Sequence, residues 1–445
     1  MIFAGMVKGA FKKAASTRGK RTLIENFFSL SALQFANYIL PLVTFPYLVR
    51  VLGPEKFGLI AFAQALIQYF IISTDYGFNY SATRDISVNR NDSQKVSNIF
   101  NSVILIKLTL CLIGFLILCA LILIVPKFKA DASIYVYTFG MVLGSAIFPT
   151  WFFQGMERMK YIAILSIIGK LFFTFAIFLF ITRESDYIYV PIINSLGLLI
   201  NGIVALFVIH NKFKIKYEFP KIRNIKDQLF EGYHIFISTV AISFYTTSNT
   251  VILGLFTNNT IVGYYSAAAK IIDAVIKLLA PFSQAVYPYI SRLESISREK
   301  ALLFIRKIFI FVASGSFLVS ISILFFTEPI VRILLGNKYG ASVMVLKILA
   351  FLPFFVGMNN VLGIQTMLTL GLKKAFSKII ITAAVLNIAL ALILTPLYKH
   401  IGISICAVIT EIFVAMSIIT YLIKAKIIGL DFLLCKGASR NPRLL

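Results

Sequence analysis

The sequence is poor in the residues that build metal centres and disulfide frameworks. It has three histidines and four cysteines in 445 residues. Three of the cysteines fall inside long apolar segments, so we expect reduced thiols and not a disulfide scaffold. The histidines are isolated from one another, which argues against a histidine-based metal site. We therefore expect neither a metal ion nor another cofactor.

The sequence also lacks the motifs and the soluble regions of an energy-converting enzyme. Nothing in it resembles a Walker loop or a dinucleotide fingerprint. The longest hydrophilic interruption, residues 210–231, is too short for a globular motor domain, which excludes an ATP-driven pump. The remaining loops are too short to hold the active site of a membrane glycosyltransferase, ligase or polymerase. We expect that the protein is not an enzyme.

Acidic residues are scarce, with 18 Asp and Glu against 43 Lys and Arg, for a net charge of +25. In a soluble protein this excess would suggest a nucleic-acid partner. Here the mean hydropathy is +0.88. The hydrophobic residues make up 59% of the chain, far above the apolar content of soluble domains. The bilayer explains the charge better, and we expect no nucleic-acid partner.

Twelve apolar segments are long enough to cross a bilayer as helices, each of which needs about 20 mainly apolar residues. They lie near residues 25–50, 57–75, 99–125, 132–155, 160–181, 187–209, 232–256, 262–288, 303–326, 342–370, 376–395 and 401–423. The sequence thus predicts an all-α polytopic membrane protein.

The basic residues predict its orientation. Most of them fall in the N-terminal arm, in the loops after even-numbered segments and in the C-terminal tail. By the positive-inside rule that side is cytoplasmic, so both termini are expected there.

The basic interruption divides the apolar segments into two equal sets. This predicts two six-helix lobes, related as parallel repeats by an axis along the membrane normal. The expected domains are a basic amphipathic arm (1–22), an N-lobe (23–209), a cytoplasmic linker (210–231), a C-lobe (232–424) and a basic cytoplasmic tail (425–445).

The strongest functional candidates lie on the eighth segment. Lys270, Asp273 and Lys277 are spaced so that they share one helix face. A charge at membrane depth costs about 2.5–3.5 kcal/mol, so each one needs a reason. One reading is a binding surface for an anion such as a phosphate. The other is a packing salt bridge between neighbouring helices.

Other buried charges allow fewer conclusions. Glu411, near the middle of the twelfth segment, either pairs with a lysine or carries a coupling proton, a second role that Asp273 could also fill. Lys107 and Lys170 lie near the ends of their segments, where we expect them to snorkel to the interface.

Uncharged polar residues and prolines mark the segments expected to line a central substrate cavity. Prolines in spanning helices favour kinks, so Pro41 and Pro46 are candidates for a gate. The other candidate substrate-binding residues are Gln34, Asn37, Tyr38, Arg50, Gln64, Gln68 and Asn249. Asn359, Asn360 and Gln365 are expected to make helix–helix contacts instead.

The segment from Leu33 to Ile86 resembles the polysaccharide exporter family of the multidrug/oligosaccharidyl-lipid/polysaccharide superfamily. The resemblance rests on Pro41, the run from Pro46 to Gly53 (Pro-Tyr-Leu-Val-Arg-Val-Leu-Gly), Phe57-Gly58, the run from Asp75 to Phe78 (Asp-Tyr-Gly-Phe) and Arg84-Asp85-Ile86. Length, segment number and the basic central loop also fit, and the chain is similar to O-antigen flippases of Gram-negative bacteria.

This resemblance implies a flippase of the bacterial inner membrane. Such proteins move undecaprenyl-diphosphate-linked oligosaccharide from the cytoplasmic to the periplasmic leaflet by alternating access, beside O-antigen polymerase and ligase machinery. The resemblance further implies that basic residues line the cavity, and Lys270 and, more loosely, Arg50 match that pattern.

Two other transporter classes stay open. A cation-coupled multidrug exporter of the same superfamily would use Asp273 and Glu411, although the lysine excess disfavours it. A major-facilitator transporter would carry a Gly/Asp/Arg-rich motif between its second and third spans, and this chain has Asp-Tyr-Gly-Phe there.

Overall fold

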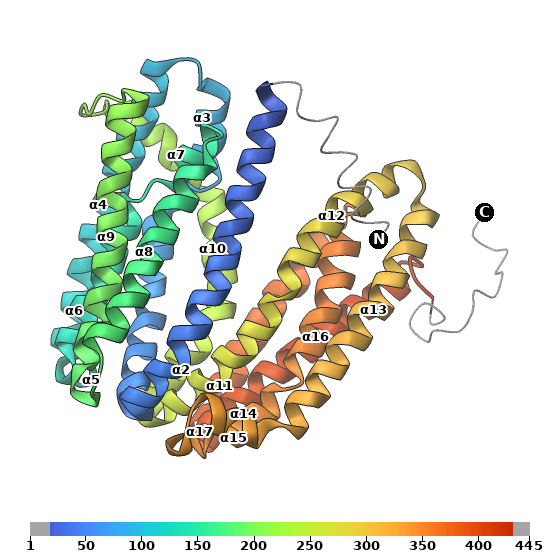
Figure 1. Cartoon of the computed structure of the whole chain (residues 1–445). Coiled ribbons are helices and arrows are strands. Elements are labelled where there is room, and N and C mark those ends of the chain that lie inside the picture. The colour runs from blue at the N-terminus through green and yellow to red at the C-terminus, as the bar shows by residue number, and fades with distance from the viewer. Residues whose placement is uncertain (1–17, 430–445) are drawn as a thin grey trace. The chain divides into compact units, whose positions relative to one another are not determined.

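The computed structural model describes residues 18–429, and every regular element in that range is a helix (Figure 1). Residues 1–17 of the predicted arm and 430–445 of the predicted tail lie outside it. Eight helices among the described residues are long and apolar enough to cross a membrane. The chain is therefore a multi-pass membrane protein, as its composition predicts.

Two of these eight helices are about twice the length that a single crossing needs. α2 (Arg18–Asp75) is interrupted at Gly53, where φ is 67° and ψ is 174°. α17 (Lys373–Lys424) is interrupted at Lys399, where φ is 52°. A positive φ is tolerated best by glycine, so Gly53 is suited to the turn between the two limbs of α2.

The described chain forms two compact units. The first contains the residues up to Leu52 together with Ala63–Ser243, and the second contains Gly53–Phe62 together with the residues from Phe244 onward. Both α2 and α10 (Ile222–Phe256) therefore contribute to each unit.

The first unit contains parts of α2 and α10 and all the helices that lie between these two in the chain. These are α3 (Ser81–Asn89), α4 (Ser93–Ile124), α5 (Pro126–Ala130), α6 (Ala132–Ile147), α7 (Thr150–Gly155), α8 (Met159–Phe180), the 3₁₀ helix η1 (Glu184–Ile188) and α9 (Tyr189–Phe213). Many leucines and isoleucines of α4 are exposed, including Leu112 and Leu116 at 59% and 61%. Such an apolar face is stable in contact with lipid, because lipid removes the free-energy cost of exposing apolar surface to water.

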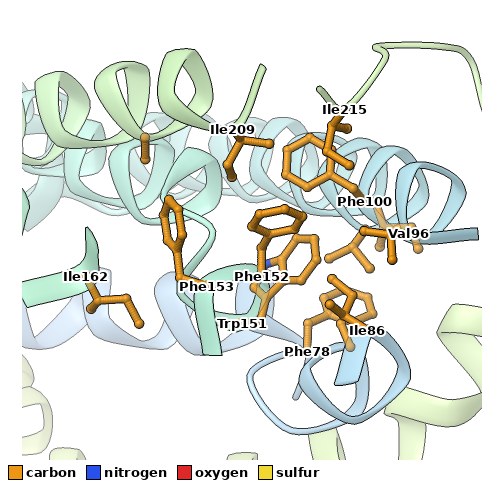
Figure 2. Packing of buried hydrophobic residues seen from close by; sticks show 14 of the residues in the cluster. Phe78, Ile86, Val96, Phe100, Trp151, Phe152, Phe153, Ile162, Ile209 and Ile215 are labelled. Atoms are coloured by element: carbon orange, nitrogen blue, oxygen red, sulfur yellow. The ribbon is translucent and has the colours of Figure 1, made fainter. Parts of the chain in front are cut away.

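An aromatic cluster forms the core at one end of this unit. Phe100, Trp151, Phe152 and Phe153 are fully buried, and Phe100 and Phe152 pack edge to face at 5.4 Å. Figure 2 shows these rings together with aliphatic side chains from α3, α4 and α9. Aromatic pairs of this geometry add to the free energy gained by burial, so the short helices α3 and α7 are held firmly.

The second unit is built from the remaining helices. They are α11 (Asn259–Lys277), α12 (Leu279–Ile296), α13 (Arg298–Phe325), α14 (Thr327–Leu334), the 3₁₀ helix η2 (Asn337–Tyr339), α15 (Ser342–Leu349), α16 (Leu352–Asn359), the π-helix η3 (Asn360–Leu368) and α17. Its core cluster includes Ile305, Leu362 and Ile418, from α13, η3 and α17.

Two glycines let the start of the second α2 limb cross α11 at backbone contact. A Cβ on Gly58 would lie 1.8 Å from the Asn259 carbonyl oxygen, and a Cβ on Gly263 would lie 1.9 Å from the Pro54 carbonyl oxygen. The contact is thus reciprocal, with each glycine meeting the backbone of the other helix. Small residues permit such close approach between helices in lipid.

Candidate functional site

The strongest candidate site is the charged face of α11. Lys270, Asp273 and Lys277 are all exposed, while Ala268 and Ile272 on the opposite face are buried. The helix therefore separates its charged stripe from its packing face, as the spacing predicts. Ser266, one turn before Lys270, is buried and does not extend the stripe.

Lys270 is positioned by the start of the second α2 limb. Its Nζ lies 5.1 Å from the ring centroid of Phe57, within the range of a cation–π contact. Phe57 directly precedes Gly58, so the close contact of Gly58 with α11 also brings the Phe57 ring next to that helix. The contact stabilises the ammonium group in a weakly polar environment without neutralising it.

The stripe suits an anionic group. Asp273 offsets one of the two lysines, which leaves one net positive charge along two turns of helix. Lys277 lies in the last turn of α11, where the helix dipole favours a cation. Ammonium groups are point donors that bind phosphate oxygens in several orientations.

In the first unit, α2 presents a second polar group of side chains. Gln34, Asn37 and Tyr38 are half-buried on one face. The Nζ of Lys170 on α8 donates a hydrogen bond to Asn37 Oδ1. Lys170 is half-buried and makes this contact within the unit, and its expected snorkelling to the interface stays a prediction.

The other candidates on α2 are more scattered. Arg50 and Gln68 are exposed, and Gln64 is half-buried. Pro41 and Pro46 lie within the helical run of the first limb, and the residue with non-helical dihedral angles within α2 is Gly53. A gating role for the two prolines stays a prediction.

Asn249 and Glu411 are engaged inside the second unit. The Asn249 side chain is hydrogen bonded to that of Tyr265, which is buried on α11. Asn359 Nδ2 donates to Glu411 Oε2 at 2.7 Å and to the Glu411 carbonyl oxygen at 3.1 Å. The expected helix–helix role of Asn359 is confirmed by this contact.

The first unit contains a buried ion pair that the sequence did not predict. The side chain of Lys107 is 2% exposed, and its Nζ lies 3.2 Å from Asp75 Oδ1 and 3.4 Å from the Ser145 carbonyl oxygen. Asn79 donates to the other Asp75 oxygen at 2.8 Å. Snorkelling of Lys107 was therefore a wrong expectation. Asp75 lies 32 positions earlier in the chain, and spacing alone could not pair the two.

A polar cluster surrounds the π-helix of the second unit. Ser283 Oγ donates to Asn360 Oδ1 at 2.9 Å, and Gln365 Nε2 donates to Ser283 Oγ at 2.6 Å. The expected contacts of Asn360 and Gln365 between helices are thus confirmed. π-helical turns often mark functional sites.

The Asp-Tyr-Gly-Phe and Arg-Asp motifs hold the beginning of α10. The ring of Tyr76 stacks on Phe236 at 4.6 Å. Gln228 Nε2 donates to Asp85 Oδ2 at 2.9 Å. The carboxyl groups of Glu231 and Asp85 also share a hydrogen bond, and desolvation followed by the nearby Asp85 charge raises the pKa of Glu231. Tyr76 and Asp85 of the motifs therefore make packing contacts with α10.

No group of three His, Cys, Asp or Glu side chains in the described range 18–429 is arranged to hold a metal ion.

The chain is similar in sequence to known proteins of polysaccharide biosynthesis and transport. A family model described as polysaccharide biosynthesis protein matches residues 23–294. A relative from Escherichia coli K12, described as "Putative O-antigen transporter", is 38% identical over 92% of this chain and 99% of its own length. A relative from Shigella dysenteriae with the same description is 29% identical over 88% of this chain and 98% of its own.

Two solved structures share the fold. The lipid II flippase MurJ in its inward closed conformation matches with a TM-score of 0.64 at 16% identity, over 93% of this chain and 89% of MurJ. An inward-facing multidrug resistance transporter of the MATE family matches with a TM-score of 0.62 at 15% identity, over 89% of this chain and 99% of that one. At these identities the likeness describes the fold alone.

Proposed function

The chain belongs to the polysaccharide biosynthesis protein family, and we propose that it is a flippase for undecaprenyl-diphosphate-linked O-antigen oligosaccharide. In this proposal it moves the lipid-linked sugar from the cytoplasmic to the periplasmic leaflet of the bacterial inner membrane. Its relatives described as O-antigen transporters match over nearly their whole length, which supports the glycan class.

The observation that carries the proposal is the exposed charged stripe on α11. A diphosphate loses hydration when it leaves the aqueous leaflet surface, and that loss is costly unless cations replace the water. Lys270 and Lys277 supply two ammonium groups on one face, and Asp273 limits their net charge. We propose that these residues bind the diphosphate. A modest positive charge favours release as well as binding.

The glycan part of the substrate is proposed to contact uncharged polar residues. On α2 these are Gln34, Asn37 and Tyr38, followed by Gln64 and Gln68. Amide and phenol groups hydrogen-bond sugar hydroxyls without selecting one sugar. We propose that Arg50 contributes a further cation and that Asn249 contributes through its partner Tyr265.

The proposed topology has twelve spans in two six-helix lobes with both termini cytoplasmic. The breaks at Gly53 and Lys399 support it, because each divides a double-length helix into two limbs. Alternating access is proposed as the mechanism, with Pro41 and Pro46 in the gate. Substrate contacts must then differ between the two states, since a ligand shifts an equilibrium only through differential affinity.

We propose no catalytic role and no cofactor. Partners in the proposal are membrane lipid, the lipid-linked oligosaccharide and the O-antigen polymerase and ligase machinery.

A cation-coupled multidrug exporter is the second candidate. The half-buried carboxylate of Glu411 favours it, because a buried acidic group can carry a coupling proton. The hydrogen bond that the Glu411 carboxylate accepts from Asn359 favours a packing role for Glu411 instead.

The test is the leaflet exposure of lipid-linked O-unit in inner-membrane vesicles. Wild type should expose the glycan on the periplasmic side, and Lys270→Ala and Lys277→Ala should leave it on the cytoplasmic side at normal protein levels. Lys270→Arg should retain part of the activity. Lys374→Ala, an exposed lysine of the same unit, is the matched control. If wild type moves no O-unit, the proposed function fails. If both alanine variants move it normally, the diphosphate site fails.

A further inference from the structure

The segment between α9 and α10, residues 214–221, forms a strap along the N-terminal half of α4 and is hydrogen bonded to both α4 and α9. Asn101 Nδ2 donates to the Lys216 carbonyl oxygen at 2.8 Å, and the Tyr217 hydroxyl donates to the Leu206 carbonyl oxygen at 2.8 Å. Ile215 is 2% exposed and belongs to the same core cluster as Phe100 (Figure 2). The strap is therefore a built part of the first unit.

Between the strap and α4 lies a shallow, open and mainly apolar groove. Ile104, Leu105 and Leu108 line it from α4, and Tyr217, Phe219 and Pro220 line it from the strap. Leu108 also belongs to the exposed apolar face of α4. The groove is thus continuous with a surface suited to acyl chains.

Phe219 is 94% exposed. A ring of this size loses the favourable free energy of burial when it is left in water. Further along, Ile222 and Phe230 are 73% and 80% exposed. A bilayer interface removes this cost, because aromatic side chains are stable at the depth of the headgroups.

Six exposed basic residues lie in the strap and in the adjoining ends of α9 and α10: Lys212, Lys214, Lys216, Lys221, Arg223 and Lys226. One acidic residue, Glu218, lies among them and lines the groove. The net charge of the segment is strongly positive. Clusters of basic residues next to a spanning helix attract anionic lipid.

We propose that this groove binds an anionic phospholipid. One acyl chain packs against Leu105 and Leu108, the ring of Phe219 inserts beside it, and the phosphate is held by Lys216 and Lys221. The site lies wholly within the first unit and shares no residue with the α11 stripe. It does not depend on the proposed transport function.

The experiment uses the full chain with Phe219→Trp, reconstituted in vesicles that contain dibrominated phospholipid. Bromine quenches tryptophan at short range, and the native Trp151 is fully buried, so wild type measures the background. Brominated phosphatidylglycerol should quench the new tryptophan more strongly than brominated phosphatidylcholine at equal mole fraction. Lys216→Gln with Lys221→Gln should lower the apparent affinity for phosphatidylglycerol roughly thirtyfold, at about 1 kcal/mol per lysine.

Lys373→Gln with Lys374→Gln removes the same charge from exposed positions of the second unit and should leave the quenching unchanged. Equal quenching by the two lipids, or no effect of the strap lysines, would overturn the anionic site. Absence of quenching above the wild-type background would overturn the groove as a lipid site altogether. Neither result bears on O-unit transport, which is measured separately.

Discussion

The reciprocal crossing of α2 and α11 makes a sharp prediction for Gly58. A Cβ at this position would lie 1.8 Å from the Asn259 carbonyl oxygen. Carbon and oxygen seldom approach within roughly 3.3 Å, so the two backbones would have to separate by about 1.5 Å. Overpacking of this kind costs about 1–3 kcal/mol. Alanine regains about 0.5–1 kcal/mol through helix propensity.

Gly58→Ala should therefore destabilise the protein by about 1–2 kcal/mol, since the clash exceeds the propensity gain. At about 2–4 °C per kcal/mol for a unit of this size, the melting temperature of the purified protein should fall by several degrees. Gly315→Ala is the matched control, because Gly315 is helical and has no atom within 4 Å of its Cβ position. It should leave the melting temperature unchanged or raise it.

The reciprocal glycine extends the test. Gly263→Ala should destabilise similarly, because its Cβ would lie 1.9 Å from the Pro54 carbonyl oxygen. One separation of the backbones relieves both overlaps, so the double variant should lose less stability than the two single losses together. If Gly58→Ala and Gly315→Ala shift the melting temperature alike, the backbone contact does not exist as described.

Three further predictions concern charged groups. Lys107→Met should lower the free energy of unfolding by about 3–5 kcal/mol, because it leaves Asp75 without its ammonium partner. Adding Asp75→Asn should restore much of this loss. If thermal unfolding shows that the two losses are additive, the ion pair is contradicted. The raised pKa of Glu231 means that its contribution to the docking of α10 on α3 is present at low pH and is lost as pH rises through the folded-state pKa. Amide exchange at the start of α10 should accordingly speed up with rising pH beyond the intrinsic rate, and Glu231→Gln should remove that excess; a pH response that persists in the variant would refute the shared proton. Glu411→Gln should leave O-unit transport with its wild-type pH dependence if the carboxylate only accepts hydrogen bonds from Asn359, whereas a flattened pH profile in the vesicle assay would assign it to coupling.

Much of this protein could be predicted from the sequence alone, because the bilayer imposes local rules. Continuous apolar segments must form helices, since lipid offers backbone groups no hydrogen-bond partner. The stripe of Lys270, Asp273 and Lys277 followed from helix periodicity, and the structure places all three on an exposed face. Spacing within one helix is local information, so no tertiary structure was needed.

What the sequence could not determine depends on contacts between distant residues. The pairing of Lys107 with Asp75, and of Lys170 with Asn37, follows from how the helices of the first unit pack. A single sequence gives the cost of a buried charge and not the identity of its partner. Both lysines were for that reason expected at the interface.

Gly58 and Gly263 show the same division, because nothing near either glycine in the sequence identifies what it packs against. Only the tertiary structure placed each glycine against the backbone of the other helix. Local sequence thus determined where helices form and which faces are polar, because those properties depend on neighbours within a few residues. Packing decided which polar groups meet, because close approach of two backbones depends on the shape of both.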